Sequence, residues 1–249
     1  MVDFTAPVIS PMAMKSFLMA GALIAVSLLA SVVGRSQTNA DSVVVAAADK
    51  DQAAREKHIR PVLGALQLSD ATKEAGVRSV LDAYFRELKT WHEENDSRIK
   101  PLWNEFNKSR SRQDTTNANE ILEKISTVYA GFKPVHEKFV ADLSAVLSPA
   151  QVESVKDVLT INKVKVTYDV YLQIFPKLTD AQKAVVMAKL KAAREEAIDC
   201  EAMTEKSAFF KKYKIQIEDD YLTAQGYDPK QARKDFAARQ KPSPQTETK

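Results

Sequence analysis

Hydrophobic residues in the middle of the chain recur with alternating spacings of four and three. The first series runs from residue 77 to residue 91, and the second runs from residue 121 to residue 146. An α-helix completes a turn every 3.6 residues, so this spacing places each series on one helical face. Two such helices joined by a polar loop at Ser109 to Asn119 form an antiparallel hairpin. The repeating positions are Val77, Leu81, Tyr84, Leu88 and Trp91, then Ile121, Ile125, Val128, Phe132, Val135, Phe139, Leu143 and Val146.

Two prolines fall within these predicted helices. Pro101 lies near the end of the first helix, and Pro134 lies in the middle of the second. A proline inside a helix removes one backbone hydrogen bond and clashes with the preceding turn. We therefore expect Pro101 to kink or stop its helix and Pro134 to bend the second one.

Short capping motifs mark the helices of the C-terminal half. Ser148 is followed three residues later by Gln151, and Thr179 is followed three residues later by Gln182. A hydroxyl at the N-cap with an amide at the third helical position is a capping box. The pattern predicts one helix from about residue 149 to 160 and another from about residue 179 to about residue 200 or 204.

The remaining C-terminal signals are less regular. The stretch Asn162 to Tyr168 alternates apolar and polar residues, which permits a short strand, but no partner strand is evident, so we favour extended coil or irregular helix. Gly226 suits a helix end, and Asp228-Pro229 suits the start of a last helix reaching about Arg239. The predicted fold class is all-α: a long bent antiparallel helical hairpin packed with shorter C-terminal helices.

The N-terminal segment has the pattern of a secretion signal. Lys15 precedes an apolar stretch at residues 17–29, and small residues follow it. This arrangement is typical of a cleavable signal peptide, here assigned to residues 1–36 with a mature start near Gln37. We therefore expect a periplasmic or secreted protein without a stable membrane anchor after cleavage. An uncleaved membrane anchor is the alternative, although the apolar stretch is short for a spanning helix.

The composition limits the domain organisation and the partners expected for the rest of the chain. We expect a disordered linker at residues 37–52, a single helical domain at residues 53–240 and a disordered tail at residues 241–249. The 36 basic and 33 acidic residues nearly balance, so nucleic acid is not an expected partner. Cys200 is the only cysteine in the 249 residues, which rules out an intramolecular disulfide, and we expect it to be buried.

Signals of catalysis or metal binding are weak. The chain contains no glycine-rich phosphate loop, nucleophile elbow or zinc motif. His58, His92 and His136 are scattered, and we interpret His136, beside the second apolar series, as a structural residue. Glu195 and Asp199 could form a carboxylate pair for glycoside hydrolysis, but acids four residues apart are common on helices. We predict no catalytic residue, no metal and no cofactor, while an accessory lyase or hydrolase role stays open.

Several C-terminal stretches resemble a single known family. They are residues 162–168, 178–183, 193–199 and 205–228. The chain resembles the domain-of-unknown-function family numbered thirty-eight twenty-six, found in exported proteins of polysaccharide-degrading bacteria and catalogued with a suggestion of sugar binding. That resemblance implies a non-enzymatic, carbohydrate-binding protein associated with polysaccharide use. It carries over no catalytic residue.

The residue types in these stretches are compatible with a sugar site. Aromatic rings can stack on a sugar, and charged side chains can hydrogen-bond its hydroxyl groups. Half-buried packing of the tyrosines and solvation of the charges are the alternative interpretation. The predicted ligand-binding residues are Tyr168, Arg194, Glu195, Asp199, Lys212 and Tyr213.

A second resemblance supplies an alternative function. The segments Leu68–Thr72, Leu147–Gln151 and Leu178–Gln182 share a short pattern. It resembles the Leu-Thr-x-x-Gln motif of the Spy and CpxP periplasmic proteins, which implies an ATP-independent chaperone or stress protein. Helix capping explains the same residues, so the motif alone does not separate a chaperone from a sugar-binding protein.

Overall fold

The structure is a computed structural model that describes residues 37–240, with side chains from Asp49 onward. The predicted signal peptide at residues 1–36 and the predicted tail at residues 241–249 lie outside the described residues. Within residues 37–240 every regular element is a helix, which confirms the all-α fold class. None of these helices is long and apolar enough to cross a membrane. The packing described below concerns the compact unit that begins at Ala48.

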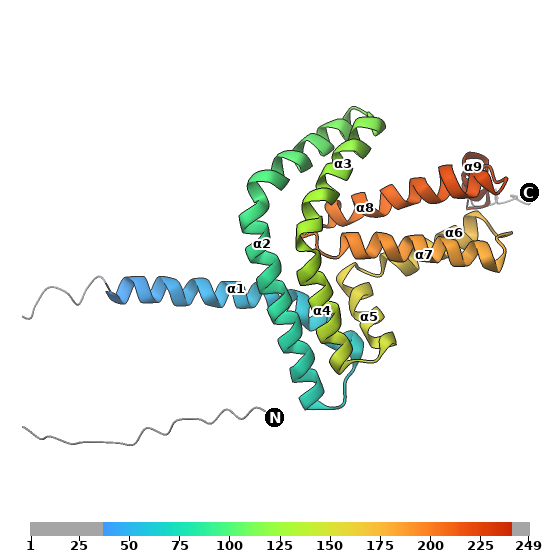
Figure 1. Ribbon diagram of the computed structural model, residues 1–249. Coiled ribbons are helices and arrows are strands. Elements are labelled where there is room, and N and C mark those ends of the chain that lie inside the picture. The colour runs from blue at the N-terminus through green and yellow to red at the C-terminus, as the bar shows by residue number, and fades with distance from the viewer. Residues whose placement is uncertain (1–36, 241–249) are drawn as a thin grey trace, which may run out of the picture. The chain divides into compact units, whose positions relative to one another are not determined.

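The predicted hairpin is present. The long helix α2 (Ala71–Ser111) packs antiparallel to α3 (Thr115–Tyr129) and also along α4 (Lys133–Val146), as Figure 1 shows. The repeating apolar residues of both series lie buried or half-buried between these helices. The four-three spacing therefore predicted correctly which helical faces are packed together.

The connection within the hairpin is shorter than predicted. The interval 109–119 was expected to be a loop, but only residues 112–114 lie between α2 and α3. The Asp114 carboxylate caps α3 by accepting from the backbone N–H of Asn117 at 3.1 Å, and the Asn117 side chain donates to the buried Ser109 hydroxyl at 2.7 Å. The polar residues of the interval 109–119 therefore belong mostly to the exposed ends of α2 and α3.

The two prolines act differently from each other. Pro101 lies inside α2, which continues past it to Ser111 and curves in Figure 1. Pro134 lies in the first turn of α4, directly after the 3-10 turn η1 (Ala130–Phe132). The second helix is therefore interrupted rather than only bent. The first turn of a helix tolerates proline because its N–H groups have no partner within the helix.

Shorter helices complete the domain, and their predicted starts are confirmed. Both capping boxes are formed, with Ser148 before α5 and Thr179 before α7. Figure 1 shows α7 and α8 running side by side in opposite directions, with α6 beside α7. The elements are α5 (Pro149–Leu159), α6 (Lys163–Ile174), α7 (Asp180–Ala197), α8 (Met203–Ile215), the π-helix η2 (Gln216–Leu222) and α9 (Pro229–Arg239).

The alternating stretch from residue 162 belongs to a regular α-helix, so the expectation of extended coil is wrong and the expected helix is regular rather than irregular. Asn162 adopts the left-handed conformation with φ 54°, which lets α6 start directly after the end of α5. In a strand Val164, Val166 and Tyr168 would share one face. In α6, Val164 is buried and Tyr168 half-buried on the inner face, and Val166 is 59% exposed. The alternation was therefore accidental.

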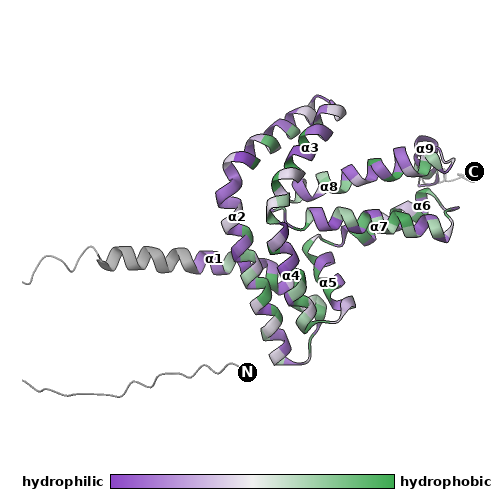
Figure 2. Ribbon diagram, viewed as in Figure 1, coloured by the Kyte–Doolittle hydropathy of each residue, from purple (hydrophilic) through white to green (hydrophobic). Residues whose placement is uncertain are grey.

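The C-terminal part of α1 (Gln37–Leu66) packs on the hairpin through Ile59 and Val62, which are fully buried. The segment 37–52, for which a disordered linker was expected, belongs to this helix in the structure. Apolar residues cluster in two neighbouring cores, one around α1, α4 and the first half of α2, the other around α3, α6, α7 and α8. In Figure 2 polar and apolar residues alternate along the ribbons, as amphipathic helices require.

Candidate functional site

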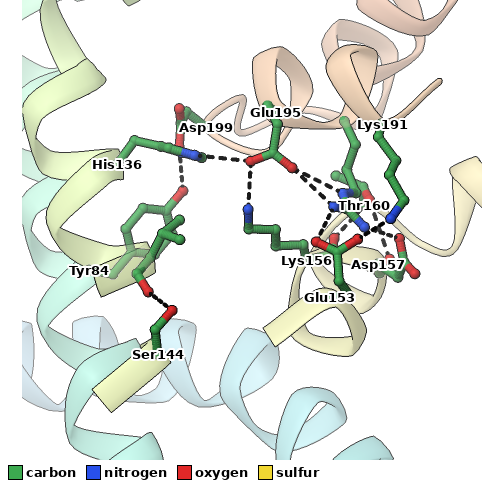
Figure 3. Close-up of polar contacts among 12 residues, drawn as sticks. Tyr84, His136, Ser144, Glu153, Lys156, Asp157, Thr160, Lys191, Glu195 and Asp199 are labelled. Carbon is green, nitrogen blue, oxygen red and sulfur yellow. Dashed lines mark hydrogen bonds and ion pairs between the residues drawn. The ribbon is translucent and has the colours of Figure 1, made fainter. Parts of the chain in front are cut away.

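Three of the predicted site residues meet at the C-terminal end of α7. Arg194 and Glu195 lie in its last turn, and Asp199 lies two residues beyond its end at Ala197. Figure 3 shows the side chains of Glu195 and Asp199 among partners from α2, α4 and α5. The structure therefore brings these three residues together, in a cluster between helices.

Asp199 connects α7 to the hairpin. The residue is 8% exposed, and its carboxylate accepts from the Tyr84 hydroxyl at 2.7 Å and from His136 Nδ1 at 3.1 Å. Its backbone oxygen lies 3.1 Å from His92 Nε2. Burial and the neighbouring Asp199 charge raise the pKa of Tyr84, which keeps its hydroxyl protonated as a donor. Asp199 is thus enclosed by polar groups of this chain.

His136 is held between two carboxylates. Its Nε2 lies 3.3 Å from Glu195, and the same Glu195 oxygen accepts from the Lys156 ammonium at 2.8 Å. Burial alone would lower the pKa of His136, but the hydrogen bonds to Asp199 and Glu195 outweigh it and raise the pKa to about 9. Burial would raise the pKa of Glu195, but His136 and Lys156 lower it to about 2. The imidazole is therefore a charged bridge near neutral pH.

Arg194 joins α7 to α5. Its side chain is only 2% exposed, and its guanidinium contacts Asp157 at 2.7 Å, Glu153 at 2.9 Å and Glu195 at 3.1 Å. Glu153 also pairs with Lys191 at 2.7 Å. Burial disfavours the guanidinium charge, but the carboxylates of Asp157 and Glu153 outweigh it and raise the pKa of Arg194. Each of its three side-chain nitrogens donates to a carboxylate of this chain, so a structural role explains this residue.

Lys212 and Tyr213 form a separate cluster between α3, α7 and α8. The Lys212 ammonium pairs with Glu123 at 3.0 Å and Glu196 at 3.2 Å, and the Tyr213 hydroxyl donates to Glu196. Burial and the Glu196 carboxylate raise the pKa of Tyr213. Adjacent residues of α7, Glu195 and Glu196, therefore serve two different clusters, as the rotation of about 100° per residue requires.

Tyr168 lies in a third place. It is half-buried on α6 and packs against the hydrophobic core. Nearby in sequence, the Tyr171 hydroxyl donates to buried Glu218 of η2 at 2.5 Å, and Arg233 of α9 donates to the same carboxylate at 2.7 Å. Tyr168 itself does not join the other predicted site residues.

A cavity of about 210 Å³ lies beside the Lys212 cluster, between the C-terminal end of α2, the start of α3 and α8. Its wall combines one aromatic ring with exposed amides and basic side chains. Lys212 is the one predicted site residue that lines it. The residues relevant to ligand binding are Phe106, Arg110, Gln113, Asn119, Lys211 and Lys212.

The interpretation of His136 as a structural residue agrees with its internal pairing, but sequence reasoning missed its partners and the cavity. The position of His136 on an apolar helical face was the available signal for a polar partner inside the domain. Its partners lie 59 and 63 residues away, which spacing along the chain cannot reveal. The cavity residues between 106 and 119 were missed because that interval was predicted to end in a loop.

Among the described residues no group of three His, Cys, Asp or Glu side chains has an arrangement that could hold a metal ion. Cys200 is buried, as expected, and burial raises the pKa of its thiol. A buried thiol with a raised pKa is a poor nucleophile.

Fold and site together define an all-helical domain with buried ionic clusters at its helix junctions and a small cavity beside one of them. The chain belongs to the family described as protein of unknown function (DUF3826), whose model matches residues 52–242. This confirms the resemblance noted in the sequence. No match was found among curated proteins.

Proposed function

We propose that this protein is an exported, non-enzymatic carbohydrate-binding protein whose ligand occupies the cavity between α2, α3 and α8. The observation that carries the proposal is the composition of the cavity wall. Buried Phe106 forms an apolar floor, while the exposed amides of Gln113 and Asn119 lie at the rim. Sugars present both apolar ring faces and hydroxyl groups, so they suit a site with these two components.

The size of the cavity limits the ligand. Its volume of about 210 Å³ lies below the roughly 300–1,000 Å³ of sites for drug-sized molecules. It therefore suits one sugar unit, with the remainder of a glycan chain extending into solvent. The free space beside Lys212 supports a ligand there rather than at Arg194, Glu195 and Asp199, whose polar groups are already paired.

Export is part of the same proposal. The basic residue Lys15 and the apolar stretch at residues 17–29 support a signal peptide, and a periplasmic or extracellular location would expose the protein to glycans.

The alternative of a Spy-like chaperone is less well supported. A chaperone of unfolded clients needs a broad exposed apolar surface. Among the described residues the large hydrophobic side chains with high exposure are Ile161, Val166, Val170 and Met203. The aromatic residues of the hairpin instead pack in its core. Binding of a small polar ligand therefore accounts better for the surface.

Isothermal titration calorimetry against a panel of plant and algal oligosaccharides tests the proposal. Gln113→Ala and Asn119→Ala should each weaken binding by up to about ten-fold, since one hydrogen bond contributes roughly 0.5–1.5 kcal/mol. Asn104→Ala, an exposed amide on α2 away from the cavity wall, is the matched control and should bind as the parent does. Absence of glycan binding, together with suppression of client aggregation, would reject the proposal in favour of the chaperone.

A further inference from the structure

The charge of the cavity wall has one sign. Three of the residues that line it are basic, namely Arg110 at the end of α2 and Lys211 and Lys212 on α8. None of the lining residues is acidic. A neutral sugar would be served by amides and hydroxyl groups, so this excess of positive charge requires a separate explanation.

The three cations differ in how far their charge is already compensated. Lys212 pairs with Glu123 and Glu196, and it is mostly shielded from solvent. Arg110 and Lys211 form no ion pair with any carboxylate of the described residues, and both are exposed at the cavity. Two uncompensated cations therefore remain available to a ligand.

Arg110 is also held in place by its surroundings. Its guanidinium carbon lies 5.8 Å from the centre of the Phe106 ring, within the range of a cation–π contact. Phe106 in turn is buried and packs edge-on against Trp103. A guanidinium kept near the cavity floor loses less side-chain freedom when it binds an anion.

We infer that the ligand is an acidic saccharide, whose carboxylate or sulfate group is bound by Arg110 and Lys211 at this cavity. The inference rests on the proposed carbohydrate-binding function and specifies its ligand class. The planar guanidinium matches the two oxygens of a carboxylate or sulfate, and the Lys211 ammonium supplies a second donor. Gln113 and Asn119 then face the hydroxyl groups of the same sugar unit.

Matched pairs of glycans separate charge from sugar recognition. Oligogalacturonides are compared with their carboxyl-reduced counterparts, and sulfated galactan oligosaccharides with their desulfated counterparts, by calorimetry on the purified protein. At least one charged member should bind, and its neutral counterpart should bind about ten-fold or more weakly. The pair that binds identifies the anion as carboxylate or sulfate.

Charge variants locate the contact. Arg110→Gln and Lys211→Gln should each weaken binding of the charged glycan by about ten- to a hundred-fold, since hydrogen bonds between charged groups are the stronger class. Lys108→Gln removes the same charge from an exposed α2 position that does not line the cavity, and it should change affinity little. Circular dichroism melts of each variant establish that it is folded.

The outcomes distinguish this inference from the proposed function. Equal binding of neutral and charged members would overturn the acidic-ligand inference and leave carbohydrate binding intact. Unchanged affinity in both folded variants would overturn the assignment to Arg110 and Lys211. Absence of binding by every member of the panel would overturn the inference together with the proposed function.

Discussion

Substitution of His136 by glutamine tests the charged bridge between α4 and the end of α7. The imidazole side chain is 14% exposed and contacts Asp199 at 3.1 Å and Glu195 at 3.3 Å. Its pKa is about 9 in the folded protein and about 6.5 in the unfolded chain. A pKa raised by folding contributes stability that is complete below about pH 6.5 and is lost as the pH rises through about 9. Glutamine cannot titrate, so it removes this dependence.

The magnitude follows from the same shift in pKa. One unit corresponds to about 1.4 kcal/mol, so a shift from 6.5 to about 9 has an upper limit of roughly 3 kcal/mol. Glu195 is 36% exposed, and solvent screening of its carboxylate reduces this figure. We therefore expect His136→Gln to lower the free energy of unfolding by about 2 kcal/mol at pH ~6. The deficit should shrink toward zero at pH ~9.5.

Urea unfolding followed by far-ultraviolet circular dichroism at these two pH values measures the effect. Burial also lowers the pKa of the Lys206 ammonium, so this group is a second possible source of pH dependence. Its contribution cancels when the variant is compared with the parent at each pH. His58→Gln is the matched control, because burial lowers the pKa of His58 and its contribution to stability has the opposite sign. A deficit of equal size at both pH values would refute the charged bridge.

Further predictions concern the core, the second ionic cluster and export. Leu81→Ala and Phe132→Ala, both at fully buried positions, should each lower the free energy of unfolding by about 2–5 kcal/mol, and unchanged melting temperatures would contradict the packed hairpin. Arg194→Met should cost about 2–3 kcal/mol because its carboxylate partners lose their cation, whereas Lys191→Met, at a 48% exposed residue, should cost less than about 1 kcal/mol. If both variants unfold at the same urea concentration, the greater burial of Arg194 does not make its ion pairs more stabilising than that of Lys191. N-terminal sequencing of protein secreted by an expressing cell should begin near Gln37, and a product retaining the apolar stretch would contradict cleavage.

The hairpin was predictable because its signal is local. Series such as Val77, Leu81 and Tyr84 repeat at helical spacing, and side chains on one helical face must be buried together. Segment 162–168 was misread because alternation over seven residues cannot distinguish a strand from a short helix with one outward apolar residue. Val166 is that residue, and it is 59% exposed on α6.

The candidate site was predictable only in part. Arg194, Glu195 and Asp199 were grouped because they are close in sequence, and the structure does bring them together. Their partners could not be found this way, since Tyr84 lies 115 residues from Asp199. That Arg110 has no carboxylate partner among residues 49–240 was equally hidden, because it depends on which carboxylates the tertiary packing leaves at a distance.

Because η2 is a π-helix, the number of residues in this segment determines how the following part of the chain is oriented. Its backbone pairs residues five apart, whereas the helix α8 before it pairs residues four apart. Deleting one residue here would allow ordinary α-helical pairing and turn everything downstream by about 100°. Glu218 could then no longer meet both Tyr171 and Arg233, although each side chain would still be present. When relatives of this protein are aligned, a one-residue gap in this segment therefore carries more structural meaning than a substitution at any single position within it.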